Sequence, residues 1–216
     1  MQKFKSGLIA GAIGIAALSM GVLHAQNGTL AGPGTADISQ VTAGTYIADA
    51  GHTLVGWRVN HFGFSDYFGL FGDVTGTLEI DPANIEAAKV SVTIPVSKVV
   101  TAAAGLTDHL LRDGQDGAAP DFFGSNPADA TFVSTSVTKT GDTTADIVGD
   151  LTLNGVTKPV TIAAEFTGAG MNPFTQKETV GFSGRARITR TEFNVNFGPQ
   201  LVTDTVDLDI VAAFEK

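Results

Sequence analysis

Apolar and polar residues alternate at every second position in segment after segment, from Val55 to the end of the chain. The alternation is clearest in 55–59, 74–80, 90–96, 147–153, 160–166 and 206–214. Successive side chains of a β-strand point to opposite faces, so each segment has one apolar face and one polar face. An apolar interior of this size is either a solid core or the lining of a container.

The spacing of these segments predicts an all-β fold of eight long strands. They fall near 52–61, 70–81, 89–97, 130–139, 144–153, 157–167, 179–190 and 204–215, with a short extra strand near 45–49. Thr140-Gly141-Asp142 and Asn154-Gly155 are typical of tight hairpins, so strands adjacent in sequence should pair. We therefore expect an antiparallel up-and-down barrel, whose closure leaves no exposed edge.

One long excursion, from Ser97 to Ala130, separates the third and fourth long strands. Apolar residues recur there every three or four positions, which predicts a short amphipathic helix carrying Leu106 and Leu110 and ending near Asp113-Gly114. Phe122 and Phe123 follow in a loop. The excursion is either a lid over a filled interior or a plug in one end of a solid barrel.

The first 25 residues have the layout of a secretory signal peptide. Lys3 and Lys5 precede an uncharged stretch that ends in Leu23-His24-Ala25, and cleavage there would leave Gln26 first. The alternative is a retained membrane anchor. Residues 26–43 have no periodicity and predict a flexible segment, so the barrel domain is expected over 44–216.

The chain is acidic and has no cysteine. Its 13 Lys and Arg against 22 Asp and Glu give a net charge of −9, and loss of Lys3 and Lys5 with the leader would make it −11. Such a surface repels nucleic acid and anionic lipid headgroups at long range, which excludes both as partners. An exported protein without disulfides must be held together by its own core.

Several motifs resemble the YceI-like family of bacterial periplasmic polyisoprenoid-binding proteins. They are Asp49-Ala50-Gly51-His52-Thr53, Val59-Asn60-His61-Phe62-Gly63-Phe64-Ser65, Gly69-Leu70-Phe71-Gly72, Asp121-Phe122-Phe123 with Pro127, Thr131-Phe132, the block from Gly149 to Val160, and Arg190 with Phe193. The resemblance covers about 45–216 and implies a lipocalin-like extended barrel in the periplasm. It further implies that the lumen holds a long isoprenoid or quinone-like chain, without catalysis.

One departure from the family pattern affects the lid. The family carries a His-Leu pair about five residues before Asp-Phe-Phe, whereas His109-Leu110 stands twelve residues before Asp121. The insertion Arg112 to Pro120 lies between them, so the family pattern does not determine the geometry of the lid or the role of His109.

Strand parity and the family motifs together give the candidate ligand-binding residues. Parity turns nine side chains inward: Val55, Trp57, Val59, Val92, Ile94, Leu151, Ile162, Phe182 and Ile188. Aromatic residues are expected at the barrel ends: Phe62, Phe64, Phe71, Phe122 and Phe123. The lid and the motifs add Leu106, Leu110, His52, His61, Phe132, Arg190 and Phe193. Taken singly, an alternating apolar residue of a β protein is more often ordinary core than a ligand contact, so the set is a stronger prediction than any of its members.

The polar residues leave further alternatives. Arg190 shares the parity of Ile188, and its buried guanidinium needs a partner, which we expect to be Asp204 or another acid rather than a ligand headgroup. No metal site is expected, because His52 and His61 stand at opposite ends of one strand. No cofactor and no assembled catalytic constellation is recognised.

Physical dimensions support a lipid as the ligand. Strands of about ten residues, at ~3.3 Å per residue and a tilt of ~40°, make a barrel about 25 Å tall. About twenty buried methylenes would contribute ~16 kcal/mol before the cost of immobilisation. We expect a long-chain isoprenoid, quinone or fatty-acyl lipid, held for transport, storage or sequestration, with a membrane or membrane protein as donor. The alternatives are a structural or adhesion domain with a solid core, and an enzyme using His52 or His109.

Overall fold

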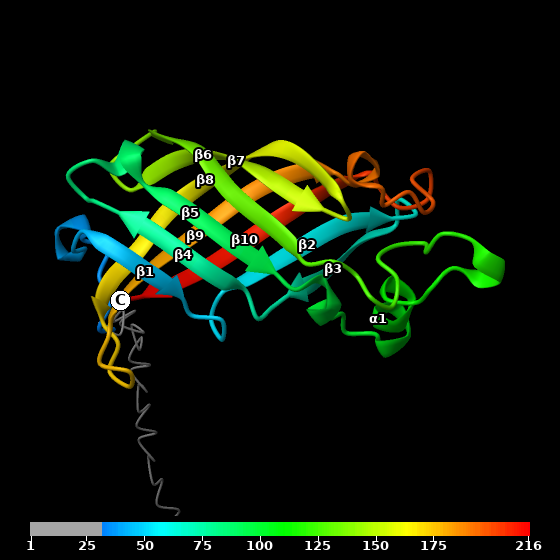
Figure 1. Ribbon diagram of the computed structural model, residues 1–216, viewed down its shortest axis with the longest axis horizontal. Helices are drawn as coiled ribbons and strands as arrows, with labels where there is room; N and C mark the ends of the chain where they lie inside the picture. The colour runs from blue at the N-terminus through cyan, green and yellow to red at the C-terminus, as the bar shows by residue number, and fades with distance from the viewer. Residues whose placement is uncertain (1–31) are drawn as a thin grey trace, which may run out of the picture. The chain divides into compact units, whose positions relative to one another are not determined.

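The computed structural model describes residues 32–216, so the predicted signal peptide and residues 26–31 lie outside the described residues. Ten antiparallel strands form one continuous sheet (Figure 1). They are β1 (Gly44–Ala48), β2 (Leu54–His61), β3 (Ser65–Phe71), β4 (Thr75–Ile80), β5 (Lys89–Ile94), β6 (Ala130–Lys139), β7 (Thr144–Leu153), β8 (Val156–Met171), β9 (Glu178–Thr189) and β10 (Thr205–Glu215).

The sheet closes on itself as an eight-stranded barrel, which confirms the predicted fold class. β1 pairs with β4 on one side and with the end of β10 on the other, where Ile47 faces Glu215. β2 pairs with the preceding part of the same β10 edge, residues 207–211. β1 and β2 are therefore two segments of one barrel strand, and β3 and β4 are two segments of the next.

The predicted single strand over 70–81 is wrong in its start and its continuity. β3 begins at Ser65, and residues 72–74 interrupt the strand before β4. Asp73 in this interruption has a φ of +55°, a left-handed conformation that a strand cannot continue through. Before the break, the outer edge of β3 does not pair with β5. Leu70 on this edge instead forms a bridge with Val100.

The excursion between β5 and β6 lies at the end of the barrel that carries β3 (Figure 1). It contains η3 (Val96–Lys98), the helix α1 (Ala104–Leu110) and η4 (Gln115–Gly117), so the predicted helix is present, and its last residue is Leu110. The Phe123 amide donates to the Leu110 carbonyl at 3.0 Å, which ties the end of the helix to the aromatic loop. The inserted residues between them form an outward loop.

The described part of the N-terminal segment packs on the barrel, which differs from the flexible segment that its composition predicted. Thr35 forms a bridge with Ala169 on β8, and η1 (Ile38–Gln40) follows. Val41 is buried, and Glu178 accepts hydrogen bonds from the amide and hydroxyl of Thr42. No helix within residues 32–216 is long and apolar enough to span a bilayer.

Candidate functional site: an apolar lumen

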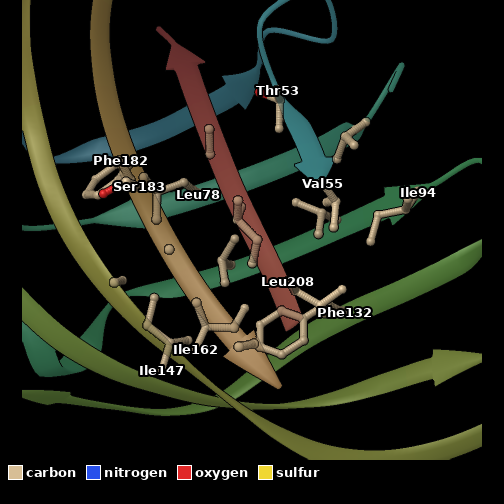
Figure 2. A pocket seen from close by; sticks show the side chains of 18 of the residues that line it. Thr53, Val55, Leu78, Ile94, Phe132, Ile147, Ile162, Phe182, Ser183 and Leu208 are labelled. Carbon is tan, nitrogen blue, oxygen red and sulfur yellow. The ribbon is translucent and has the colours of Figure 1, made fainter. Parts of the chain in front are cut away.

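The barrel interior contains a central cavity of about 150 Å³. Figure 2 shows Leu78, Ile94, Ile147 and Ile162 pointing into it from different strands. Among its lining residues in the described chain, only Thr53 and Ser183 carry polar side-chain atoms. The Thr53 hydroxyl donates to the Ala213 carbonyl, so it is satisfied by the wall itself. The central cavity can therefore favour only an apolar occupant.

A second and larger cavity of about 300 Å³ lies at the end covered by the excursion; we call it the mouth cavity. β2 and β3 supply Trp57, Val59 and Tyr67 to its wall, and α1 with the following loop supplies Leu106, Leu110, Phe122 and Phe123. Leu208 lines both the mouth cavity and the central cavity, so the two are adjacent along the barrel. The excursion thus contributes side chains to the lumen wall, as both a lid and a plug would.

A third cavity of about 130 Å³, which we call the far cavity, lies at the opposite end of the barrel. Five side chains line both this cavity and the central one: Leu78, Val90, Ile147, Ala164 and Phe182. Lys139 at the end of β6 and Asp142 in the β6–β7 turn border it. The three cavities therefore form a row inside the barrel.

All nine residues predicted from strand parity line this row, as do eight of those predicted from the lid, the barrel ends and the family motifs. On the central cavity lie Val55, Val92, Ile94, Phe132, Leu151, Ile162 and Phe182. On the mouth cavity lie Trp57, Val59, His61, Phe71, Leu106, Leu110, Phe122, Phe123, Ile188 and Arg190. Their contact with a ligand stays a prediction, whereas their position on the wall is a property of the fold.

Four predicted residues do not line the lumen. His52 lies in the turn before β2, where its Nδ1 is 2.6 Å from Asp49 Oδ2 and its side chain is 78% exposed. Phe62 and Phe64 lie at the tip of the β2–β3 hairpin and face solvent. Phe193 is buried in η5 (Arg190–Phe193) within a core cluster. Parity applies inside a strand, and all four stand outside one.

Arg190 is buried as predicted, but its expected acidic partner is wrong. Its guanidinium donates to three backbone carbonyls, those of Thr203 at 3.1 Å, Val195 at 2.8 Å and Val202 at 2.9 Å. The Asp204 carboxylate instead accepts from the amide and hydroxyl of Thr191. Desolvation lowers the pKa of Arg190 from its ordinary value, although the nearby Asp204 charge opposes the shift. Arg190 therefore fixes the 190–204 segment against the mouth cavity.

His109 and Asp121 meet despite the insertion between them. His109 Nε2 is 2.6 Å from Asp121 Oδ2, and Arg112 donates to the same oxygen at 3.2 Å. The hydrogen bond with His109, followed by that from Arg112, holds the pKa of Asp121 below its ordinary value. His109 also packs edge-on against Phe122 and Phe197, with ring centroids 5.2 and 5.4 Å apart. The pair therefore fastens the helix to the aromatic loop that covers the mouth cavity.

Trp57 lines the mouth cavity beside Gly69, its partner on β3. A Cβ added at Gly69 would clash with the indole ring. The Trp57 Nε1 is the one buried side-chain nitrogen or oxygen in residues 32–216 that has no hydrogen-bond partner. An unpaired buried donor costs about 1–3 kcal/mol of folding free energy.

The lumen wall also contains residues that the sequence-based prediction does not include. On the central cavity they include Val74, Leu78, Val90, Ile147, Val160, Ala164, Ala186, Ile210 and Phe214, and on the mouth cavity Tyr67, His109, Leu153, Val195, Phe197, Val202 and Val206. Many of them belong to the same alternating segments, so parity could have found them. Val195, Phe197 and Val202 lie outside a strand and had no such signal. No group of three or more His, Cys, Asp or Glu within 32–216 is arranged to hold a metal ion.

The fold and the lumen define a small closed barrel with an internal apolar compartment. Residues 46–214 match the YceI-like domain, and the chain belongs to this family. A UPF0312 protein of Pseudomonas putida strain F1 is 39% identical over 181 residues, which cover 82% of this chain and 90% of that protein.

Solved structures agree in fold. The YceI protein of Campylobacter jejuni superposes with a TM-score of 0.61 at 28% identity, over 73% of this chain and 89% of that one. A polyisoprenoid binding domain from Saccharophagus degradans has the same fold, with a TM-score of 0.57 at 13% identity over 81% of this chain and 99% of that one.

Proposed function

We propose that this protein binds one long isoprenoid or quinone-like lipid inside its barrel, without catalysis. The observation that carries the proposal is the row of three cavities in a closed barrel, with an almost wholly apolar wall at its centre. A related fold that is described as a polyisoprenoid binding domain supports the same ligand class. A solid core is disfavoured, because protein interiors are normally packed with few voids larger than a water molecule.

The cavity volumes set the length of the enclosed chain. A dry cavity of about 150 Å³ binds benzene, so this volume accommodates about six carbons. On that scale the central, mouth and far cavities of about 150, 300 and 130 Å³ hold about two dozen carbons, or four to five isoprene units. At ~0.8 kcal/mol per methylene the gross gain is ~19 kcal/mol, which exceeds the cost of immobilisation.

The headgroup belongs at the mouth cavity. His61, Tyr67, His109 and Arg190 line that cavity, whereas the central cavity offers only Thr53 and Ser183. A guanidinium has five N–H donors, and Arg190 uses three of them on backbone carbonyls. The remaining donors suit the oxygen of a quinone, alcohol or phosphate. The apolar tail would then extend through the central cavity.

Export completes the proposal. The leader over 1–25 is removed, and the protein works in the periplasm as a carrier, store or scavenger of its lipid. N-terminal sequencing of protein from fractionated cells checks this step. The expected first residue is Gln26 or a close neighbour, and an intact Met1 in the membrane fraction would contradict it.

Native mass spectrometry of mildly purified protein, followed by organic extraction, tests the proposed ligand. We expect one isoprenoid, quinone or acyl lipid per chain, and a higher melting temperature when ubiquinone is added to delipidated protein. Protein without stoichiometric lipid, together with an unchanged melting temperature, would instead favour a structural or adhesion domain.

A further inference from the structure

The barrel end that carries the mouth cavity also carries an unusual group of exposed apolar side chains. Four of them lie at the ends of two neighbouring loops, which we call the aromatic tip: Phe62 and Phe64 on the β2–β3 hairpin, and Phe197 and Leu201 on the 193–203 loop. Phe64 is 90% exposed. The Phe62 amide donates to the Leu201 carbonyl at 2.7 Å, so the two loops form one surface. Both lie at the same end of the barrel in Figure 1.

The two loops of the aromatic tip also contain no charged residues. Residues 59–65 and 193–203 contain no Asp, Glu, Lys or Arg, although the chain as a whole has a net charge of −9. The opposite end is different. There Phe174 is 93% exposed, but it lies in a turn where Lys177 pairs with Glu215. The nearest charges to the tip flank its loops: Asp66, which accepts from Asn60 and lies close to Arg58, and Glu192 and Asp204 beyond the second loop.

The aromatic tip is continuous with the wall of the lumen. Phe197 contacts the rings of His109 and Phe122 while also lining the mouth cavity, and His61 and Val202 line the same cavity at the base of the two loops. His61 and Val202 form a β-bridge that joins the loops there. A lipid leaving the mouth cavity would therefore reach the tip first.

We propose that the aromatic tip docks on the surface of a lipid bilayer and inserts its rings among the acyl chains. Single aromatic side chains on loops suit insertion at a membrane interface. An uncharged tip allows an acidic protein to approach a bilayer without placing carboxylates against the headgroups. The proposal rests on the lipid-binding function above, since it supplies the route by which lipid enters and leaves the mouth cavity. A contact between two copies of the chain would favour a flat apolar face, whereas the Phe64 ring projects into solvent.

Two matched substitutions test the docking surface, Phe64→Asp on the aromatic tip and Phe174→Asp at the opposite end. Both side chains are about nine-tenths exposed, so neither substitution removes core packing. The exported protein, with its N-terminus verified by intact mass, is mixed with phosphatidylcholine vesicles, and binding is measured by flotation. Transfer of ubiquinone between vesicles is measured in parallel. Native mass spectrometry of each variant records the bound lipid.

We expect the wild-type protein and Phe174→Asp to bind vesicles within twofold of each other. Phe64→Asp should bind at least about tenfold more weakly and transfer ubiquinone correspondingly more slowly, because burying one phenylalanine ring is worth about tenfold to hundredfold in partitioning. Its lipid content should match that of the wild type. At low salt, phosphatidylglycerol in the vesicles should weaken binding of all three proteins through repulsion of the acidic barrel.

Equal vesicle binding by Phe64→Asp and the wild type would overturn the proposal. So would a wild-type protein that fails to float with vesicles, or one whose Phe64→Asp variant changes from dimer to monomer without any change in vesicle binding, since the tip would then be a contact between copies. If no purified protein contains lipid, the proposed ligand fails, while flotation of the same samples still decides whether the tip binds a bilayer.

Discussion

Ala164 and Ala163 are adjacent on β8, but their side chains leave the strand on opposite faces. Ala164 lines both the central and the far cavity, whereas Ala163 is exposed beside Arg185. Phenylalanine at position 164 would add about six carbons at the junction of the two cavities and so close off the far one. The exposed Ala163→Phe is the matched control, because it adds the same group outside the lumen.

The structure gives the size of the effect. About six displaced ligand carbons, at ~0.8 kcal/mol each, cost ~5 kcal/mol of binding for a chain that fills the whole row, or about three orders of magnitude in Kd. A shorter chain that ends before the far cavity loses nothing. Delipidated Ala164→Phe should be as stable as the wild type, since the ring fills empty space. In a solid core the same insertion would cost about 1–3 kcal/mol.

The assay is a titration with isoprenoid alcohols of increasing length, combined with urea unfolding of the delipidated proteins. For the wild type and Ala163→Phe, affinity should rise until the chain has about 25 carbons, whereas for Ala164→Phe it should stop rising about five carbons earlier. An Ala164→Phe protein that binds every chain length like the control, or that is destabilised like an overpacked core, would refute a lumen-bound lipid.

Three further predictions concern the mouth cavity. Trp57 fluorescence should be quenched by short-chain ubiquinone. Trp57→Ala should lower the free energy of unfolding, measured in urea, by about 3–5 kcal/mol in delipidated protein. The loss should be smaller in loaded protein, because the lipid chain refills part of the space. Arg190→Met should lower stability by about 3 kcal/mol or more in the same assay, because it leaves three carbonyls unpaired. The matched control is Arg187→Met, which should change stability little, because the Arg187 side chain is exposed and its pair with Asp207 lies at the surface. The lowered pKa of Asp121 means that its pair with His109 is intact above the unfolded carboxyl value of about 3.9 and is lost as the pH falls through the lower folded value. Lipid release measured by stopped flow should therefore accelerate below about pH 4, and Asp121→Asn should release faster at pH 7; release rates independent of both changes would contradict a fastened lid.

The sequence by itself determined the barrel and much of its lining. Alternation is a local property of an extended backbone, so the parity of Val55, Val92, Ile162 and Ile188 gave their inward direction before any contact was known. The hairpin residues Asn154-Gly155 similarly determined that β7 and β8 are neighbours, because a tight turn places the two strands that it joins side by side.

Tertiary structure decided everything that depends on how strands end and what fills the space between them. Phe62 and Phe64 face outward because Phe62 and Gly63 have φ values of +55° and +73° in the hairpin turn, where strand parity no longer applies. Arg190 found backbone carbonyls instead of Asp204 because the 190–204 segment folds around it. The cavity volume of the lumen also cannot be read from the sequence, since an alternating strand has the same pattern whether its inner face meets side chains or a cavity. The diameter at which eight strands close sets that volume.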